Sequence, residues 1–344
     1  MKITKIKKPF IIAEAGVNHE NNIKIAELLI KEASEGGASA IKFQTYKAEK
    51  IASKQSPSYW DTNEIKINSQ YKLFKKYDKF NQVDYFKLKK ICDHYKIEFM
   101  STPFDDESAF FLNKIQRFFK IASADITNYP LIEQISKFKK PIIFSTGASN
   151  TVEINNVYKL LVNKKIQVGI LHCILSYPTL YKDANLALID FFKKKFNNAT
   201  IGISDHSIPD KNMLLLTKAF DLGAEIIETH FTIKKFKGKK NNDHFHSVDK
   251  DDLIKLNDNI RLLQLIVGNK INRNVLPVEK KSRKFARRSI YTNINIKKGD
   301  IFNYKNLIPK RPGTGISPIY LKKIIGKKAK KNIKNDTQIK LNDF

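Results

Sequence analysis

The sequence is poor in cysteine and has no long apolar run, and these two shortages exclude several classes of protein. Cys92 and Cys173 are the two cysteines among 344 residues, and neither lies in a Cys-x-x-Cys motif. We therefore expect two reduced, buried thiols rather than a disulfide framework or a zinc site. All apolar runs fall short of the roughly 20 residues that span a bilayer, which predicts a protein with no membrane-spanning helix.

Acidic residues are also scarce relative to basic ones. The chain has 34 Asp and Glu against 63 Lys and Arg, a net charge of +29, and residues 271–344 contribute +16 of it. A charge of this size is compatible with binding to nucleic acid or to an anionic membrane. Asn and Ile are abundant together with Lys, however, as in proteins encoded by genes rich in A and T, and no RNP or Cys2His2 motif is present. We therefore expect a local anion site and neither nucleic acid nor membrane as partner.

The first residues, MKITKIKKPFIIAEAG, are basic and then apolar. The apolar part is shorter than a signal-peptide core and continues into Glu14 instead of a small-residue cleavage site. We interpret this segment as the first strand of the fold and expect a cytoplasmic protein.

Eight short apolar runs, each ending in polar residues, recur along the first two thirds of the chain. They read IIAEAGVNH (11–19), AIKFQT (40–45), FMSTPFD (99–105), KIASAD (120–125), IIFSTG (142–147), GILHCILSYP (169–178), IGISDH (201–206) and IIETHFT (226–232). Helix-like segments separate them, and the connection at 46–83 is long enough for a lid or binding loop. This alternation predicts an α/β fold, a (β/α)8 TIM barrel, with its active site at the C-terminal ends of the strands.

The pattern changes after residue 268. Residues 269–284 are polar and basic, which indicates a linker, whereas residues 285–344 carry short β-type runs separated by turns at KKGD and RPGTG. We therefore predict a catalytic barrel at 1–268, a linker at 269–284 and a small β-rich domain at 285–344.

Two histidines lie at neighbouring strand ends. His206 ends the seventh run and His230 lies near the end of the eighth, so their imidazoles are expected over the same pocket. Two such rings can hold one divalent transition metal and leave coordination positions for substrate and water. His244 and His246 follow on a loop. We expect them either to contact the metal-binding residues without binding the metal themselves, or to lie at the surface.

Cations, hydroxyls and acids recur at the other strand ends. Lys42 and Lys120 lie in apolar strands, where a lysine is costly unless it meets a partner. Hydroxyl groups end four of the runs, at Thr102, Ser123, Ser145 and Ser204. Together these groups suit a phosphate or a carboxylate. Glu14 and Asp243 belong to neighbouring parts of a closed barrel and can serve as general acid and base or orient a metal-bound water.

In this order the motifs resemble those of the sialic acid synthases. The matching segments are IAEAGVNHE, IKFQT, STPFD, KIASAD with NYPLI, STGAS, LHC with SYPT, GISDHS and ETHFT. The C-terminal RSIY, IKKGD and KRPGTGI resemble the antifreeze-like (SAF, β-clip) domain of the same family. The resemblance covers nearly the whole chain.

The resemblance implies a reaction and a cofactor. Phosphoenolpyruvate would condense with an N-acyl hexosamine, either N-acetylmannosamine or a 2,4-diacetamido-dideoxy hexose, and with water. The products would be a nine-carbon 2-keto sugar acid and phosphate, released by C–O cleavage. A divalent metal, commonly Mn²⁺ with Mg²⁺ or Co²⁺ as alternatives, would be held by His206 and His230 and would polarise the sugar aldehyde.

The resemblance also assigns roles to residues. Phosphoenolpyruvate is expected at Lys42, Thr102, Lys120, Ser123, Ser145 and Ser204, and catalytic roles at Glu14, Gln44, Tyr177 and Asp243. The sugar is expected to contact Asp125, Tyr177 and Arg311. Family members form domain-swapped homodimers in which the SAF domain covers the active site of the other subunit, and Arg311 would reach the sugar from there.

Two departures from the family pattern lie near the sugar. Leu175 stands where synthases of N-acetylneuraminate often carry Asn, and the loop after the eighth run reads KNNDHFHSVD where Gly-Pro-Asp is common. An apolar Leu at this position fits a more deoxygenated sugar.

Two alternatives to this synthase remain from the residues alone. One is a Schiff-base aldolase that uses Lys42 or Lys120. The other is a basic scaffold that binds nucleic acid without turnover.

Overall fold

The computed structural model describes residues 8–60, 62, 66–233, 243–268 and 273–344. The chain divides into two compact units, Met1–Asn269 and Lys270–Phe344. Among the described residues, no helix has both the length and the apolar content needed to cross a bilayer.

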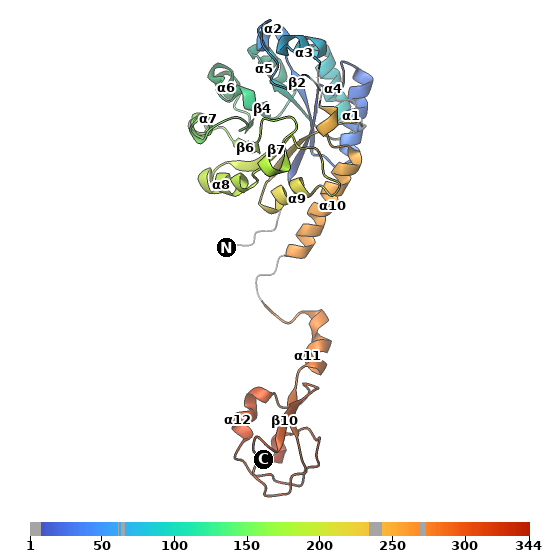
Figure 1. The fold of residues 1–344 in the computed structure, drawn as a ribbon, viewed down its shortest axis with the longest axis vertical. Helices are drawn as coiled ribbons and strands as arrows, with labels where there is room; N and C mark the ends of the chain where they lie inside the picture. Colours follow the sequence, from blue (N-terminus) through green and yellow to red (C-terminus); the bar gives the residue numbers. More distant parts are fainter. Residues whose placement is uncertain (1–7, 61, 63–65, 234–242, 269–272) are drawn as a thin grey trace. The chain divides into compact units, whose positions relative to one another are not determined.

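Eight parallel strands form the centre of the first unit (Figure 1). They are β1 Phe10–Gly16, β2 Ala40–Thr45, β3 Glu98–Pro103, β4 Phe119–Ile121, β5 Ile142–Ser145, β6 Val168–Cys173, β7 Thr200–Asp205 and β8 Ile226–His230. Hydrogen-bonded neighbours run in the order β3-β2-β1-β8-β7-β6-β5-β4, and β3 and β4 also contact each other. The predicted (β/α)8 barrel is thereby confirmed.

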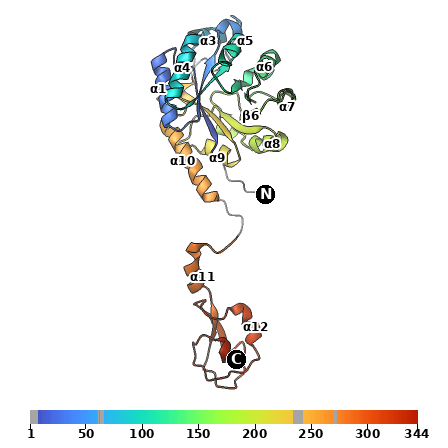
Figure 2. The same cartoon turned by 180° about the vertical axis from the view of Figure 1, so that it is seen from behind.

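Helices surround these strands, as Figures 1 and 2 show from opposite sides. They are α1 Ile23–Glu35, α4 Gln82–His94, α5 Asp106–Leu112, α6 Tyr129–Ser136, α7 Thr151–Asn163, α8 Ala187–Lys195, α9 Leu214–Asp221 and α10 Lys250–Val267. Several begin at an Asn or Asp whose side chain accepts hydrogen bonds from the first free backbone amides, for example Asn81, Asn150 and Asp249. Such caps fix where each helix starts and therefore the length of each connection at the strand ends.

The long connection after β2 contains two short helices, α2 Ala48–Ile51 and α3 Gln70–Tyr77. Helix α3 begins at Ser69, whose hydroxyl accepts a hydrogen bond from the Lys72 amide. The connection contributes Tyr59 and Phe74 to the wall of the cavity described below.

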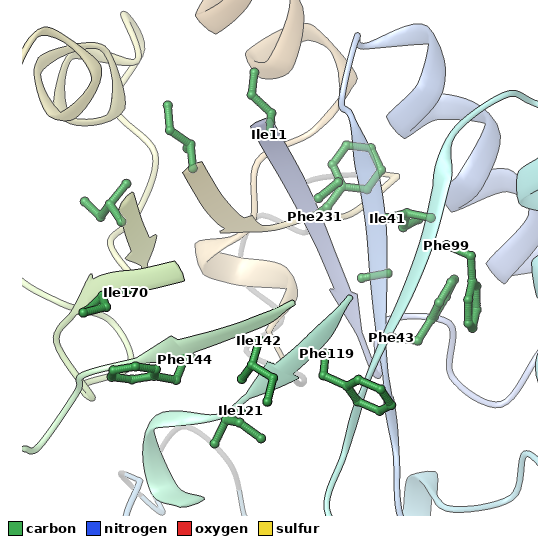
Figure 3. Packing of buried hydrophobic residues seen from close by; sticks show 14 of the residues in the cluster. Ile11, Ile41, Phe43, Phe99, Phe119, Ile121, Ile142, Phe144, Ile170 and Phe231 are labelled. Atoms are coloured by element: carbon green, nitrogen blue, oxygen red, sulfur yellow. The ribbon is translucent and has the colours of Figure 1, made fainter. Parts of the chain in front are cut away.

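Side chains alternate between the two faces of each strand, and this alternation creates both the core and the site. Outward positions such as Ile11, Ile41 and Phe99 pack against the helices in a large apolar cluster. Figure 3 shows part of this cluster, in which the rings of Phe43 and Phe99 lie 6.1 Å apart between centroids. Burying one such side chain stabilises the fold by about 1.5–3 kcal/mol.

Inward positions change from apolar to polar along each strand. A second buried cluster fills the lower barrel interior with Ile12, Ala40, Met100, Ile143, Leu171 and Ile226. Two residues further along the same strands, the inward positions are Glu14, Lys42, Thr102, Ser145, Cys173 and Glu228. The barrel therefore has an apolar floor, and its charged groups gather at the C-terminal ends of the strands.

The second unit has its own small core. An antiparallel pair, β9 Ser289–Thr292 and β10 Leu307–Lys310, packs with the short helix α12 Leu321–Ile324 around buried residues such as Ile290 and Phe302. This confirms the predicted small β-rich domain. Helix α11 Lys280–Ala286 lies in the segment that we expected to be mostly linker. The expected third β-type run, 339–344, instead ends in a helical turn at Leu341–Asp343.

Candidate active site

A cavity of about 440 Å³ opens at the C-terminal ends of the strands. Its lining includes the predicted site residues Glu14, Lys42, Gln44, Thr102, Lys120, Ser123, Asp125, Ser145, Tyr177, Ser204, His206 and His230. A larger cavity of about 640 Å³ lies at the opposite end, among the first residues of strands such as Phe10, Val168 and Ile226. Its charged lining residues are Lys8, Lys193 and Glu225, so the chemistry gathers in the smaller cavity.

Two lysines and two glutamates, which we call the lysine cluster, form the floor of the polar cavity: Lys42, Lys120, Glu14 and Glu228. The Lys42 ammonium lies 2.6 Å from Glu14 Oε2 and 3.7 Å from Glu228 Oε1, and Lys120 Nζ lies 3.4 Å from the same Glu228 oxygen. All four side chains are nearly fully buried. Buried charges of this kind persist because each has an opposite charge in contact.

The two lysines differ in how well they are compensated. Burial lowers the pKa of Lys42, but the carboxylates of Glu14 and Glu228 outweigh burial and leave that pKa raised. Burial also lowers the pKa of Lys120, and Glu228 only partly offsets it, so that pKa stays below its usual range. Burial raises the pKa of Glu228, but the two ammonium groups outweigh it and hold that pKa low. Lys42 and Glu228 are therefore charged, and Lys120 is the most easily neutralised of these three groups.

The predicted hydroxyl groups surround this cluster. Thr102 Oγ1 accepts a hydrogen bond from Lys42 Nζ at 3.1 Å, and Ser204 Oγ donates to Glu228 Oε1 at 3.1 Å. Ser123 Oγ accepts from the Gly147 amide at 3.0 Å. Ser145 Oγ is buried and has no hydrogen-bond partner within the described part of the chain. A hydroxyl group without a hydrogen-bond partner in a polar pocket is available to bond a ligand.

Glu14, Gln44 and Asp243 meet around Gly16. Gln44 Nε2 donates to Glu14 Oε1 at 3.0 Å. Gly16 has φ +51°, and a Cβ atom there would lie 3.3–3.5 Å from the Gln44, Glu14 and Asp243 side chains. Glycine therefore satisfies both the left-handed backbone and the close approach at this bulge in β1.

Three imidazoles and one carboxylate, which we call the histidine cluster, lie beside the lysine cluster: His206, His230, His246 and Asp243. The His230 ring centroid lies 5.3 Å from that of His206 and 4.6 Å from that of His246. Asp243 Oδ2 lies 3.4 Å from His230 Nδ1. Burial raises the pKa of Asp243, but the imidazoles of His230, His246 and His206 together outweigh burial and lower that pKa, so Asp243 is a carboxylate at neutral pH.

The histidine cluster has the donors that a divalent transition metal requires. Each of His230, Asp243 and His246 offers one ligand atom, and the three atoms lie within 4.8 Å of one another. His206 Nδ1 donates to the Ile174 carbonyl at 2.8 Å, which leaves its Nε2 as the nitrogen with a lone pair. His230, Asp243 and His246 therefore fit a metal of the class that the family resemblance implies, whereas His206, the other expected ligand, lies outside this group of three.

The loop that carries Asp243 and His246 is tied to the barrel. The Val248 amide donates to the His230 carbonyl at 2.8 Å, and Ser247 Oγ donates to the Asp243 carbonyl at 2.5 Å. Asn18, after β1, donates through Nδ2 to the Phe231 carbonyl at 2.9 Å and to Ser247 Oγ at 3.2 Å. Asn18 thus positions this loop from the neighbouring strand end.

Aromatic and apolar side chains line one part of the cavity. The Tyr177 ring packs on His206 with 4.2 Å between centroids. Leu175 and Tyr59 also line this part of the cavity, together with Asp125, whose pKa burial raises. Asp125 Oδ1 accepts a hydrogen bond from Asn128 Nδ2 at 3.1 Å. Arg311 belongs to the second unit, where its side chain is exposed.

Two residues of the site were missed or misplaced by the sequence analysis. Glu228 pairs with both lysines, and its inward position two residues before His230 could have revealed it. His246, which we expected behind the site or at the surface, is buried against His230. The other predicted residues of the barrel lie around one cavity, but their roles stay predictions.

The chain matches two family models, the NeuB family over residues 29–272 and the SAF domain over residues 287–344. It is 38% identical to an uncharacterised protein of Methanocaldococcus jannaschii, covering 99% of this chain and 96% of that protein. It is 36% identical to the N,N'-diacetyllegionaminic acid synthase of Campylobacter jejuni, covering 97% of this chain and all of the synthase.

A solved structure gives the same result. The N-acetylneuraminic acid synthetase of Leptospira borgpetersenii superposes with a TM-score of 0.69 at 32% identity, covering 80% of this chain and 90% of that one. The family models, the sequence identities and the shared fold leave one assignment: the chain is an enzyme of the NeuB family, the sialic acid synthases that form carbon–carbon bonds, and it carries a C-terminal SAF domain.

Proposed function

We propose that this enzyme condenses phosphoenolpyruvate with an N-acyl hexosamine and water to give a nine-carbon 2-keto sugar acid and phosphate. The observation that carries the proposal is the meeting of the lysine cluster and the histidine cluster in one cavity of a NeuB-family barrel. The first provides cations and hydroxyls for an anionic phosphate ester, and the second provides donors for a metal next to it.

Phosphoenolpyruvate binds at the lysine cluster in this proposal. Lys42 and Lys120 contact its phosphate and carboxylate oxygens, while Thr102, Ser123, Ser145 and Ser204 donate or accept hydrogen bonds around them. Both ammonium groups already pair with Glu228, so the entering anion competes with that carboxylate. The unpartnered Ser145 hydroxyl is ready to donate to a ligand oxygen.

The bonds balance as follows. Carbon 3 of phosphoenolpyruvate attacks the aldehyde carbon of the open-chain sugar, and the aldehyde oxygen takes up a proton. Water adds to the cationic carbon 2 and loses a proton. The C–O bond to phosphate then breaks while the carbon 2 hydroxyl forms the keto group, and the hydroxyl proton passes to the departing phosphate, which is released as inorganic phosphate.

Four polar residues act at the reacting atoms in this scheme. Glu14 and Asp243 are carboxylates positioned to accept the proton of the attacking water, and Gln44 orients Glu14 through its 3.0 Å hydrogen bond. Burial raises the pKa of Tyr177 well above its usual value, so its hydroxyl stays protonated and can donate to the sugar.

The expected metal, Mn²⁺ with Mg²⁺ or Co²⁺ as alternatives, would be held by His206 and His230. When bound, it would polarise the sugar aldehyde as a Lewis acid. Tyr177 packs over these imidazoles and limits the access of bulk water to that side of the cavity.

The proposal allows more than one N-acyl hexosamine as the sugar substrate. Leu175 gives the sugar side of the cavity an apolar wall, which favours a 2,4-diacetamido-dideoxy hexose over N-acetylmannosamine. Two relatives, at 36% and 32% identity, are named N,N'-diacetyllegionaminic acid synthase and pseudaminic acid synthase. Asp125 is expected to contact the same sugar.

The proposal extends to assembly and location. We expect a cytoplasmic, domain-swapped homodimer in which Arg311 contacts the sugar. Replacing Arg311 by Ala should then raise KM for the sugar and leave KM for phosphoenolpyruvate unchanged.

A phosphate-release assay tests the proposed reaction directly. Phosphoenolpyruvate is offered with a panel of N-acyl and dideoxy hexosamines, with Mn²⁺ added or with metal removed by chelation. We expect metal-dependent phosphate release with at least one sugar and none without sugar. Full activity in chelator, or release from phosphoenolpyruvate alone, would contradict the proposal.

A second experiment tests the Schiff-base aldolase alternative at Lys120. The lysine of such an aldolase needs a lowered pKa, and Lys120 has one. Borohydride is added during turnover, and the protein is analysed by mass spectrometry. An unmodified protein is expected; a reduced adduct on Lys120 would favour the aldolase.

A further inference from the structure

His246 is a buried histidine whose ring nitrogens have no hydrogen-bond partner within residues 8–60, 62, 66–233, 243–268 and 273–344. Its side chain is completely shielded from solvent. The nearest opposite charge is Asp243, with Oδ1 at 3.9 Å from His246 Nε2. A buried polar ring is expected to have a bonding partner. The ring of His246 therefore points to a ligand bound inside the histidine cluster.

The neighbours of His246 are the groups expected to hold the metal. Its ring centroid lies 4.6 Å from that of His230 and 6.5 Å from that of His206. The ligand atoms of His230, Asp243 and His246 lie within 4.8 Å of one another. Three donors around one ion at about 2.1 Å lie roughly 3.0–3.6 Å from one another. Ligand atoms as far apart as 4.8 Å must therefore approach one another by about 1–2 Å for all three to bind.

The backbone around His246 is held in place. Residue 248 bridges to β8 through the Val248 amide and the His230 carbonyl, and the Thr232 amide returns a bond to the Val248 carbonyl at 2.9 Å. Asn18 and Ser247 add the side-chain contacts described above. Such support reduces the cost of organising ligands around an ion.

We propose that His246 is a third imidazole ligand, so that this enzyme binds its metal through His206, His230, His246 and the Asp243 carboxylate. The inference rests on the proposed metal-dependent function and adds two ligands, His246 and the Asp243 carboxylate, to the pair His206 and His230. Nitrogen donors favour late first-row ions, in the order Mn²⁺ below Co²⁺, and disfavour Mg²⁺. Such a site should therefore bind Co²⁺ or Zn²⁺ more tightly than it binds the expected Mn²⁺, and Mg²⁺ least tightly.

The X-ray absorption spectrum of the zinc-loaded full-length protein tests this without any substitution, because each imidazole adds outer-shell scattering. We expect three imidazoles in the unmodified protein and two in the His246→Ala variant. Two imidazoles in the unmodified protein would overturn the proposal, whatever the variant does.

Metal titrations provide the second readout. In His246→Ala the dissociation constant should rise roughly 100-fold for Co²⁺ and about tenfold for Mn²⁺, because imidazole contributes more to the later ion. The matched control is His244→Gln, in the same helical turn, whose ring faces Glu20 and Thr232; its metal affinity should stay within about twofold of the unmodified protein. Equal Co²⁺ affinity with and without His246 would contradict the proposal.

Two further measurements keep the result interpretable. Thermal unfolding of the metal-free forms shows whether His246→Ala folds, and His246→Gln, which keeps most of the volume, replaces it if it does not. If three imidazoles bind but no sugar supports phosphate release, the metal site stands and the proposed reaction fails. If phosphate is released and two imidazoles are found, the reaction stands and this inference fails.

Discussion

The two clusters of the cavity are built in opposite ways. In the lysine cluster every charge has an opposite charge in contact, and Glu228 alone serves both ammonium groups. In the histidine cluster buried ring nitrogens of His230 and His246 lack hydrogen bonds within the described part of the chain. The charges of the first cluster are paired without a ligand, whereas the second cluster has buried nitrogens that a ligand could pair with. In the proposed reaction the first cluster would exchange its carboxylate for an anion, and the second would hold a metal ion.

Replacing His206, an expected metal ligand in the histidine cluster, should have the largest effect on the rate of phosphate release. In His206→Ala, phosphate release should fall by about 10³-fold or more, since several kcal/mol of Lewis-acid stabilisation are lost. Steady-state rates with saturating Mn²⁺ measure this, and the thermal midpoint of the metal-free variant serves as the folding control. Activity near that of the unmodified protein would show that the imidazole pair is dispensable.

Removing the shared carboxylate should break the first cluster. In Glu228→Gln both lysines lose a buried partner, and the free energy of unfolding should drop by about 3 kcal/mol. Phosphate or phosphoenolpyruvate should restore part of this loss, because the anion takes the place of the carboxylate. Urea unfolding with and without phosphate measures both values, and destabilisation that phosphate does not relieve would argue against an anion at this position.

The lowered pKa of Lys120 predicts that anion binding at the lysine cluster depends on pH. The charged form of Lys120 binds the anion, so binding raises its pKa and takes up a proton. Affinity for phosphoenolpyruvate should therefore be full below the pKa of free Lys120 and fall above it, by up to about tenfold per pH unit. Dissociation constants between pH 6 and 10 measure this.

The matched variant for the pH experiment is Lys120→Arg. A guanidinium stays charged across this range, so the variant should lose the pH dependence even if its affinity is lower. An unchanged pH profile in Lys120→Arg would assign the dependence to another group.

The smallest expected effect is a change in sugar preference on replacing Leu175 in the cavity wall. In Leu175→Asn the ratio of kcat/KM for N-acetylmannosamine to that for a 2,4-diacetamido-dideoxy hexose should rise about tenfold, since an amide can bond a sugar hydroxyl that an apolar side chain cannot. A ratio that does not move would remove Leu175 as the reason for the expected preference.

Sequence reasoning predicted the barrel because apolar strand runs recur at regular spacing, and it found Lys42 and His230 because each stands out in such a run. Alternation within a strand was not used fully: Glu228 occupies the inward position next to Lys42 and Lys120 and could have been predicted. The place of His246 could not, because it depends on how a loop returns to β8 through Val248. The cap at Ser69 that starts helix α3 was likewise hidden within the connection at 46–83.

The most direct test of the proposed reaction follows one oxygen atom. Phosphoenolpyruvate carrying ¹⁸O at the oxygen between carbon 2 and phosphorus is turned over with the sugar that supports phosphate release, and the phosphate is analysed by mass spectrometry. Condensation with C–O cleavage places the ¹⁸O in the released phosphate. Phosphate without the label would mean that the P–O bond breaks, and it would contradict the reaction proposed for the two clusters.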